Sequence, residues 1–311
     1  MIKPKKLKFG DTIGIVAPGS PTTEEKVEKA YEKLKEMGFK VKLGKSCYSK
    51  YGYLAGRDEL RAEDLNSMFR DTEVDGIICL RGGYGTIRIL ELLDYNLIRA
   101  NPKVFVGYSD ITVIHIAINQ ISNLVTFHGP MAASDLAGDI SNFSLDSLFN
   151  SILDRDFDGN LKNPTEELIT INGGVAEGQI IGGNLSLITS TIGTPYEIDT
   201  KGKILFIEEI GEEPYRIDRM LNQLKLSNKL QEAEGIILGN FSNCMPEDPD
   251  MSLTLEEVID DLIRPLNKPT LYNLQAGHCD PNITIPFGVR VRLNADRKEI
   301  VVLEKPTLEV Y

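Results

Sequence analysis

The chain has 311 residues, of which 41% are hydrophobic and 26% are charged, a balance typical of a soluble globular protein with one large or two smaller domains. Its formal net charge of -12 leaves no basic stripe for phosphates, which argues against a nucleic-acid partner. No apolar run approaches the roughly 18 residues of a membrane span, and no apolar region follows the lysines near the start as in a secretory signal. The four cysteines are scattered, which fits reduced thiols in a cytoplasm.

The first half of the chain alternates predicted strands and helices. Predicted strands cover residues 11–17, 39–43, 74–80, 104–106 and 124–127. Predicted helices begin at Thr22 or Thr23 and cover 57–69, 87–93 and 144–153. Alternation of this kind with Ile/Val-rich strands favours a parallel sheet covered on both faces. We therefore expect an N-terminal, parallel-sheet, Rossmann-like α/β domain over residues 1–165, which ends at a stretch rich in turn formers.

The second half, residues 166–311, has shorter predicted strands. They cover 167–171, 178–181, 203–207, 235–238, 283–285, 289–293 and 299–303, with helices over 184–192, 215–226 and 253–263. The last three strands are separated by short turns, which favours antiparallel hairpins. The pattern predicts a mixed α/β domain with a barrel-like or curled sheet.

A serine follows the predicted strand 104–106 at the point where a helix begins. The order of strand, Gly107, Ser109 and helix is the layout that presents a nucleophilic hydroxyl at the edge of a sheet. The simpler alternative is that Ser109 or Asp110 only caps the helix, because both residue types are favoured N-caps. The loop 81–85 follows another parallel strand, and ligands bind beyond the carboxyl ends of such strands. The two loops together predict a site at this edge.

Two further sets of residues carry possible chemistry. The adjacent acids Glu208 and Glu209 end an apolar strand, where a buried carboxylate needs a partner. In the simpler alternative one acid is solvated and the other pairs with Arg216 or Arg219. Histidine is rare here, so His278, in a turn before the last hairpins, has few competitors as a catalytic base. The others are His128, which follows a strand end and is the rival candidate, and His115, which lies on another face of the helix after Ser109.

Neither a metal nor a cofactor is expected. No two histidines or cysteines stand at ligand spacing, and no acidic calcium-binding loop is present. The glycine pairs at 82–83, 173–174 and 182–183 fit neither the dinucleotide fingerprint nor the P-loop. Their simpler use is to let a backbone amide point into a site.

Together these segments resemble the LD-carboxypeptidase family of serine peptidases, which includes muramoyltetrapeptide carboxypeptidases and microcin C immunity peptidases. The resemblance runs from residue 13 to the C-terminal hairpins. The matching motifs lie at residues 54–57, 81–85, 107–110, 206–209, 214–219, 277–278 and 286–288.

The resemblance implies a triad with Ser109 as nucleophile, Glu208 as acid and His278 as base, and Glu209 is the alternative acid. It implies an oxyanion hole made by the backbone amides of Asp110 and Gly83. Ile111 stands where the α/β-hydrolase turn G-x-S-x-G has its second glycine, but triads recur on unrelated folds. Because Ser109 lies in the first half and the other two triad residues in the second, domain packing would assemble the site.

The implied activity is removal of the terminal D-alanine from a murein tetrapeptide in the cytoplasm by a homodimer. Tyr84, Asn184 and Glu209 are the expected substrate contacts, with a plain N-cap as the alternative role of Asn184. A rival enzymatic interpretation is a microcin C-type peptidase that cleaves acyl-aminoacyl nucleotides. A third is a non-catalytic two-domain protein that binds a small ligand.

Overall fold

The computed structural model describes residues 1–153 and 157–308, which form two compact units. The first unit holds the described residues of 1–157, 284–288 and 305–311. The second holds 158–283 and 289–304. The two predicted domains, 1–165 and 166–311, stay a prediction.

The first unit is built on a six-stranded sheet in the order β11-β5-β4-β3-β1-β2. Its strands are β1 (Thr12–Val16), β2 (Lys40–Leu43), β3 (Gly76–Cys79), β4 (Val104–Gly107), β5 (Thr126–His128) and β11 (Ile285–Phe287). Strands β1 to β5 are parallel, as predicted, and β3 and β4 are buried along their whole length. Strand β11 was expected in the C-terminal hairpins, but it pairs antiparallel with β5. That prediction was wrong, because spacing by turns indicates a strand without saying which sheet it joins.

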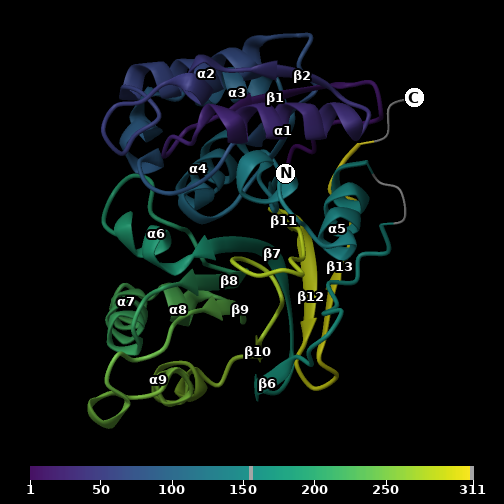
Figure 1. Cartoon of the computed structure of the whole chain (residues 1–311). Coiled ribbons are helices and arrows are strands. Elements are labelled where there is room, and N and C mark those ends of the chain that lie inside the picture. Colours follow the sequence, from purple (N-terminus) through teal and green to yellow (C-terminus); the bar gives the residue numbers. More distant parts are fainter. Residues whose placement is uncertain (154–156, 309–311) are drawn as a thin grey trace. The chain divides into compact units, whose positions relative to one another are not determined.

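The described residues of this unit form five α-helices (Figure 1): α1 (Glu24–Glu36), α2 (Asp58–Arg70), α3 (Tyr95–Ala100), α4 (Thr112–Ala117) and α5 (Asn142–Leu153). Thr23 caps α1, and its side chain accepts from the Lys26 N–H. Helix α1 packs against β2, α2 against β1 and α4 against β5. The helix predicted over 87–93 is a 3-10 helix, η2 (Thr86–Leu92).

The strand order brings three loops to one edge of this sheet. Strand β1 has β2 on one side and β3 on the other, so the chain leaves β1 toward one side and later returns to the other. Ligand sites of open parallel sheets lie at the carboxyl ends of the strands beside such a reversal. The loops that follow β1, β3 and β4 lie at this edge.

The second unit contains a curled seven-stranded sheet in the order β13-β12-β7-β8-β9-β10-β6 (Figure 1). Its strands are β6 (Ile169–Asn172), β7 (Val175–Asn184), β8 (Lys203–Ile210), β9 (Gly235–Ser242), β10 (Thr270–Tyr272), β12 (Arg290–Asn294) and β13 (Glu299–Val302). The four central strands β7 to β10 are parallel, and the flanking strands are antiparallel. The mixed sheet and the β12–β13 hairpin confirm the predicted class of this half.

Four helices flank the second sheet (Figure 1): α6 (Leu185–Ser190), α7 (Pro214–Leu226), α8 (Lys229–Glu232) and α9 (Leu255–Leu262). Helix α7 buries Ile217, Leu221 and Leu224, which lie on one helical face. Helix α9 begins with a capping box between Thr254 and Glu257. The helices predicted from apolar spacing in this half are therefore confirmed within a few residues.

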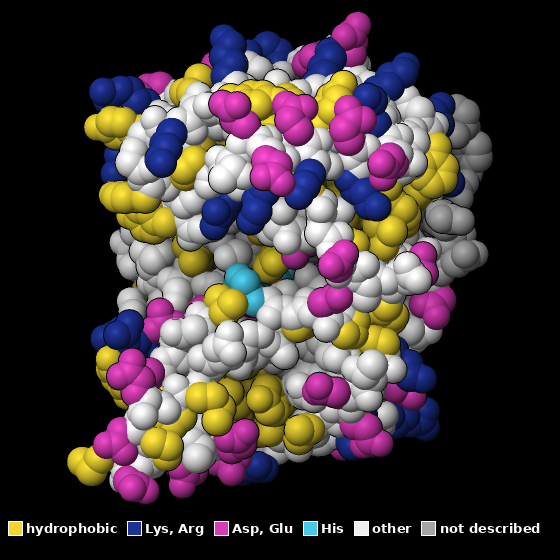
Figure 2. All heavy atoms as spheres, in the orientation of Figure 1, with side chains coloured by type: hydrophobic (Ala, Val, Ile, Leu, Met, Phe, Trp, Pro, Cys, Tyr) yellow, Lys and Arg dark blue, Asp and Glu magenta, His cyan; other side chains and the backbone are white. Residues whose placement is uncertain are grey.

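Charged side chains of both signs are interspersed on the face of the molecule shown in Figure 2. Within the described ranges, no helix has both the length and the apolar character needed to cross a membrane.

Candidate active site

Ser109 stands at the turn between β4 and the helices that follow it. Its φ is 63°, in the left-handed region that non-glycine residues rarely adopt. The other described non-glycine residues with positive φ are five asparagines and one lysine, so this serine is unusual. Strained backbone of this kind clusters at functional sites, and nucleophilic serines lie on such strand-to-helix turns.

The simple capping interpretation of this turn is wrong. Ser109 begins a 3-10 helix, η3 (Ser109–Ile111), which continues into α4. The N-cap positions of η3 and α4 are Tyr108 and Ile111, and neither makes a side-chain cap hydrogen bond. Neither Ser109 nor Asp110 therefore stands at the N-cap position of these two helices.

The glycine loop after β3 lies directly beside this serine. A Cβ added to Gly82 would lie 3.1 Å from the Ser109 Cβ and 3.3 Å from its Oγ. The Ser20 N–H donates to the Gly82 carbonyl at 3.1 Å, which fastens the loop to the turn after β1. Gly83 has a φ of 100°, and no acceptor among the described residues is bonded to its N–H. An amide held beside a nucleophile is the element from which oxyanion holes are built.

Asp110 connects the nucleophile turn to the same loop. Its buried carboxylate accepts from the Thr86 N–H at 3.0 Å, and the Thr86 hydroxyl donates to the Asp110 carbonyl. Burial raises the pKa of the Asp110 carboxyl, while hydrogen bonds from Thr86 and Gly85 act in the opposite direction. The side chain of Asp110 thus has a structural role beside that predicted for its amide.

The second unit contains an acid–histidine pair. His278 Nδ1 lies 2.7 Å from Oε2 of Glu208, which is fully buried in β8. A carboxylate only accepts, so Nδ1 donates and the lone pair of the neutral ring is on Nε2. This is the tautomer that a general base needs.

Two backbone features hold that pair in place. A Cβ on Gly277 would lie 2.6 Å from the Glu208 Oε2, and the φ of Gly277 is 111°, so only glycine fits before His278. The Ser242 hydroxyl donates to the His278 carbonyl. The Gly-His motif is therefore explained by the close approach of the carboxylate.

Glu209, the alternative acid, has different partners. It accepts from Asn184 Nδ2, the Ser186 N–H and the Ser186 hydroxyl at 2.7–2.8 Å, and burial raises its pKa. Asn184 is the N-cap of α6 and accepts from the Leu187 N–H. The alternative capping role of Asn184 is confirmed, and substrate contact by Asn184 or Glu209 stays a prediction.

The simpler alternative, in which one acid is solvated and the other pairs with an arginine, is wrong for the described chain. Arg216 contacts Glu212 and Tyr215, and no ion pair joins Arg216 or Arg219 to Glu208 or Glu209 among the residues described. Polar partners from α6 and the histidine replace the expected cations.

The two other histidines lie in the core of the first unit. His115 Nε2 donates to the Gly107 carbonyl at 2.7 Å, and burial lowers the His115 pKa to about 4. His128 is a buried residue of β5 whose ring packs against Tyr108 and Phe287. Their burial in a hydrophobic core suits packing rather than proton transfer.

Tyr84, a predicted substrate contact, is half exposed and packs edge-on against Tyr53 with ring centroids 5.6 Å apart. Its N–H donates to the Ser20 hydroxyl at 3.1 Å. The tyrosine ring therefore lies next to the glycine loop, and its contact with a substrate stays a prediction.

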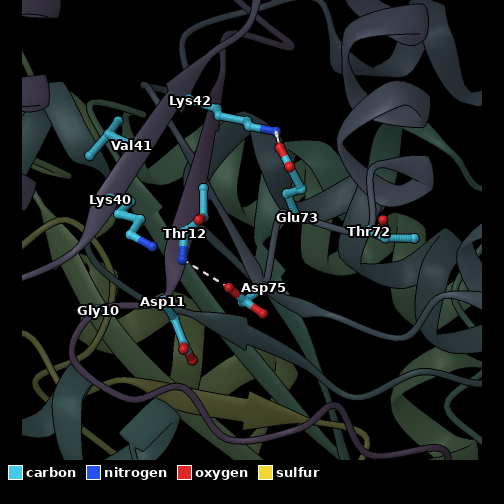
Figure 3. A pocket seen from close by; sticks show the side chains of 9 residues that line it. All are labelled: Gly10, Asp11, Thr12, Lys40, Val41, Lys42, Thr72, Glu73 and Asp75. Carbon is cyan, nitrogen blue, oxygen red and sulfur yellow. Dashed lines mark hydrogen bonds and ion pairs between the residues drawn. The ribbon is translucent and has the colours of Figure 1, made fainter.

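A surface pocket of about 500 Å³ lies elsewhere in the first unit (Figure 3). Its lining residues include Asp11, Thr12 and Lys40, at the amino ends of β1 and β2. Lys42 at its rim is paired with Asp71 and Glu73. The pocket is thus at the opposite end of the strands from Ser109.

Comparison with known proteins assigns the chain to a family. Residues 13–129 match the LD-carboxypeptidase N-terminal domain, and residues 177–293 match the LD-carboxypeptidase C-terminal domain. The chain belongs to the LD-carboxypeptidase family. This membership confirms the prediction of a serine-type LD-carboxypeptidase, and the candidate nucleophile and acid–histidine pair lie in the two matched regions.

Relatives of this LD-carboxypeptidase cover nearly its whole length. A probable murein peptide carboxypeptidase of Bacillus subtilis is 48% identical over 96% of this chain and 94% of the relative. A crystal structure of muramoyltetrapeptide carboxypeptidase from Oxalobacter formigenes has a TM-score of 0.80 and 31% identity, and covers 93% of this chain and 97% of that one. A structure of MccF in complex with glutamyl sulfamoyl guanosine has a TM-score of 0.90 and 25% identity, with coverage of 99% and 100%. The predicted fold class is thereby confirmed.

Sequence reasoning missed several residues that support the site. Thr86 and Ser242 hold the backbones of Asp110 and His278, yet no motif distinguishes them from other hydroxyl residues. Arg61 is a fully buried charge in α2. A buried arginine at one position of a charged helix has no recognisable pattern in a single sequence.

Proposed function

We propose that this enzyme releases the terminal D-alanine from murein tetrapeptide by hydrolysing the bond between the L-centre of the diamino acid and D-alanine. Ser109 is the nucleophile, His278 the general base and Glu208 the residue that orients and stabilises the histidine. The amides of Gly83 and Asp110 form the oxyanion hole. The observation that carries this proposal is the 2.7 Å hydrogen bond between Glu208 and His278, together with the left-handed backbone conformation of Ser109 next to a glycine loop.

The proposed mechanism has two steps. His278 Nε2 takes the Ser109 proton while Oγ attacks the scissile carbonyl, and the protonated histidine then gives that proton to the departing D-alanine amine. A water that His278 deprotonates then attacks the acyl-enzyme, and the histidine returns that proton to Ser109 Oγ as the bond between Oγ and the acyl carbon breaks. Glu208 accepts the hydrogen bond from Nδ1 and stabilises the imidazolium in each step. The two amides stabilise the negative oxygen that develops in both transition states.

The substrate class is supported by the relatives. The Bacillus subtilis protein is named for murein peptide and the Oxalobacter formigenes protein for muramoyltetrapeptide, and both are at least 31% identical to this chain over most of its length. Because MccF shares the fold at a TM-score of 0.90, acylated nucleotides are the alternative substrate.

A substrate panel tests the proposal. The protein is incubated separately with murein tetrapeptide, with an aminoacyl sulfamoyl nucleoside and with buffer alone, and products are identified by mass spectrometry. Release of free D-alanine from the tetrapeptide alone is the expected result. Turnover of the nucleoside alone would favour the MccF-like alternative, and binding of either compound without turnover would favour a non-catalytic binding protein.

We also propose that the enzyme acts in the cytoplasm as a homodimer. Scattered cysteines, all free in the described structure, support a reducing compartment. The dimer is carried over from the family resemblance. Light scattering after size-exclusion chromatography should give about twice the chain mass of 34.6 kDa, and a mass near 34.6 kDa would contradict it.

A further inference from the structure

Among the described residues of the first unit, Arg61 is the most deeply buried cation. It lies in α2, its side chain is fully inaccessible to solvent, and its guanidinium contacts backbone oxygens of two separate loops. Nη1 donates to the Pro18 carbonyl and, at 2.9 Å, to the Gly85 carbonyl. A charge in such a place is costly unless well paired, so its two backbone contacts need an explanation.

Both loops that Arg61 holds are part of the candidate active site. Pro18 precedes Gly19 and Ser20, and Ser20 bonds to Gly82 and Tyr84. Gly85 closes the glycine loop and precedes Thr86, which bonds to Asp110. The guanidinium thus ties the Gly85 end of the loop that carries the Gly83 amide to the turn after β1, and Ser20 of that turn holds the rest of the loop.

The fit around the guanidinium is close. A Cβ on Gly85 would lie 3.0 Å from the Arg61 Nη1. The second terminal nitrogen, Nη2, donates to Asp58, whose carboxylate also accepts from Nε and Nη2 of the exposed Arg88. The planar guanidinium suits this arrangement, because its several N–H donors can reach three oxygens on different elements at once. Lysine would offer only a point charge.

We propose that Arg61 is a positioning residue for the oxyanion hole. It holds the glycine loop between the turn after β1 and the nucleophile turn, so that the Gly83 amide keeps its place beside Ser109. This inference rests on the proposed function, in which Ser109 and Gly83 act on the same carbonyl. Arg61 itself does not touch substrate.

The test uses the full-length enzyme with Arg61→Lys, Arg61→Ala and the control Arg88→Ala. Arg88→Ala also removes a partner of Asp58, but it leaves the loop contacts of Arg61 intact. Two rates are measured: release of D-alanine from murein tetrapeptide, and labelling of Ser109 by a fluorophosphonate, whose phosphonyl oxygen also occupies an oxyanion hole. Melting temperatures and folded fractions are measured in parallel.

Both Arg61 variants should lose about 100-fold in kcat and in labelling rate, the loss typical of one misplaced oxyanion donor, with KM within about threefold. Methylguanidinium should restore part of the labelling rate of Arg61→Ala and leave Arg88→Ala unchanged. The proposal would be overturned if both Arg61 variants were labelled at the wild-type rate per folded molecule. A residue with a merely structural role would lower the stability of the protein but not the labelling rate of the folded molecules.

Two further outcomes remain decisive. If the Arg61 variants do not fold, Asp58→Asn takes their place, because it weakens the contact that holds the guanidinium without removing the arginine. The rate of Ser109 labelling should then fall several-fold. An unchanged labelling rate in Asp58→Asn would overturn the proposal. Where the wild type labels at Ser109 but releases no D-alanine, the proposed substrate is wrong, and the labelling rates still decide the role of Arg61.

Discussion

Two adjacent carboxylates of β8 have different partners because neighbouring side chains of a strand point to opposite faces. Glu208 contacts His278, and Glu209 contacts the start of α6. The register between β8 and β9 shifts between Ile207 and Glu209, and irregularities of this kind often re-aim side chains near active sites. The pair could be predicted as a candidate from sequence, but the choice between the two acids required the positions of α6 and of the loop at 277–278.

Glu208→Gln should abolish most activity without loss of the fold. The amide keeps the shape of the carboxylate, but it favours the wrong histidine tautomer and lacks the charge that stabilises the imidazolium. The expected loss in kcat is about 10⁴-fold, as for the corresponding acid-to-amide change in a serine protease triad. Steady-state release of D-alanine measures it, and a kcat within tenfold of wild type would exclude Glu208 as the triad acid.

Gly277→Ala should damage the same pair through the backbone. The new methyl group would lie 2.6 Å from the Glu208 carboxylate at a φ of 111°. Gly193→Ala is the matched control, because Gly193 has a φ of 84° and nothing within 4 Å of its added Cβ. Chemical denaturation should show both variants destabilised by about 1 kcal/mol or more, but only Gly277→Ala should lose kcat. Equal kcat in the two variants would contradict the role given to this glycine.

At the scale of elements, Glu209 joins β8 to the first turn of α6. Glu209→Gln replaces one acceptor oxygen by a donor, although all four groups around the carboxylate donate to it: the Asn184 amide, the Ser186 N–H and hydroxyl, and the Ile210 N–H. The expected cost is about 1–3 kcal/mol of unfolding free energy, measured by denaturant titration. Activity per folded molecule should fall far less than in Glu208→Gln. A stable variant without activity would reverse the roles of the two acids.

Most helices and strands could be predicted from local pattern, because their apolar spacing is strong. The burial of β3 and β4, for example, could be predicted from their Ile- and Val-rich sequences. Strand β11 could not be placed, since its pairing with β5 is set by residues more than a hundred positions away. The same limit hid Arg61, whose burial depends on two loops that α2 meets only in the folded chain.

At the scale of the whole molecule, His115 should make stability depend on pH. Burial lowers its pKa to about 4 from 6.5, so the unfolded chain takes up the proton first as pH falls. Stability is therefore lost between about pH 6.5 and pH 4, by an amount on the order of 2–3 kcal/mol. His115→Gln keeps a donor for the Gly107 carbonyl but does not titrate. Chemical denaturation at pH 7.5 and pH 4.5 should show that the variant loses less unfolding free energy than the wild type between the two pH values. Equal losses would contradict the assignment of this pH dependence to His115.

The most direct test of the central claim is the rate at which Ser109→Ala releases D-alanine from murein tetrapeptide. The substitution removes only the hydroxyl oxygen, so the turn, the glycine loop and the Glu208–His278 pair should persist. Wild-type enzyme should release D-alanine, and the variant should be slower by about 10⁴-fold or more at an unchanged melting temperature. Release by Ser109→Ala at the wild-type rate would show that this serine is not the nucleophile.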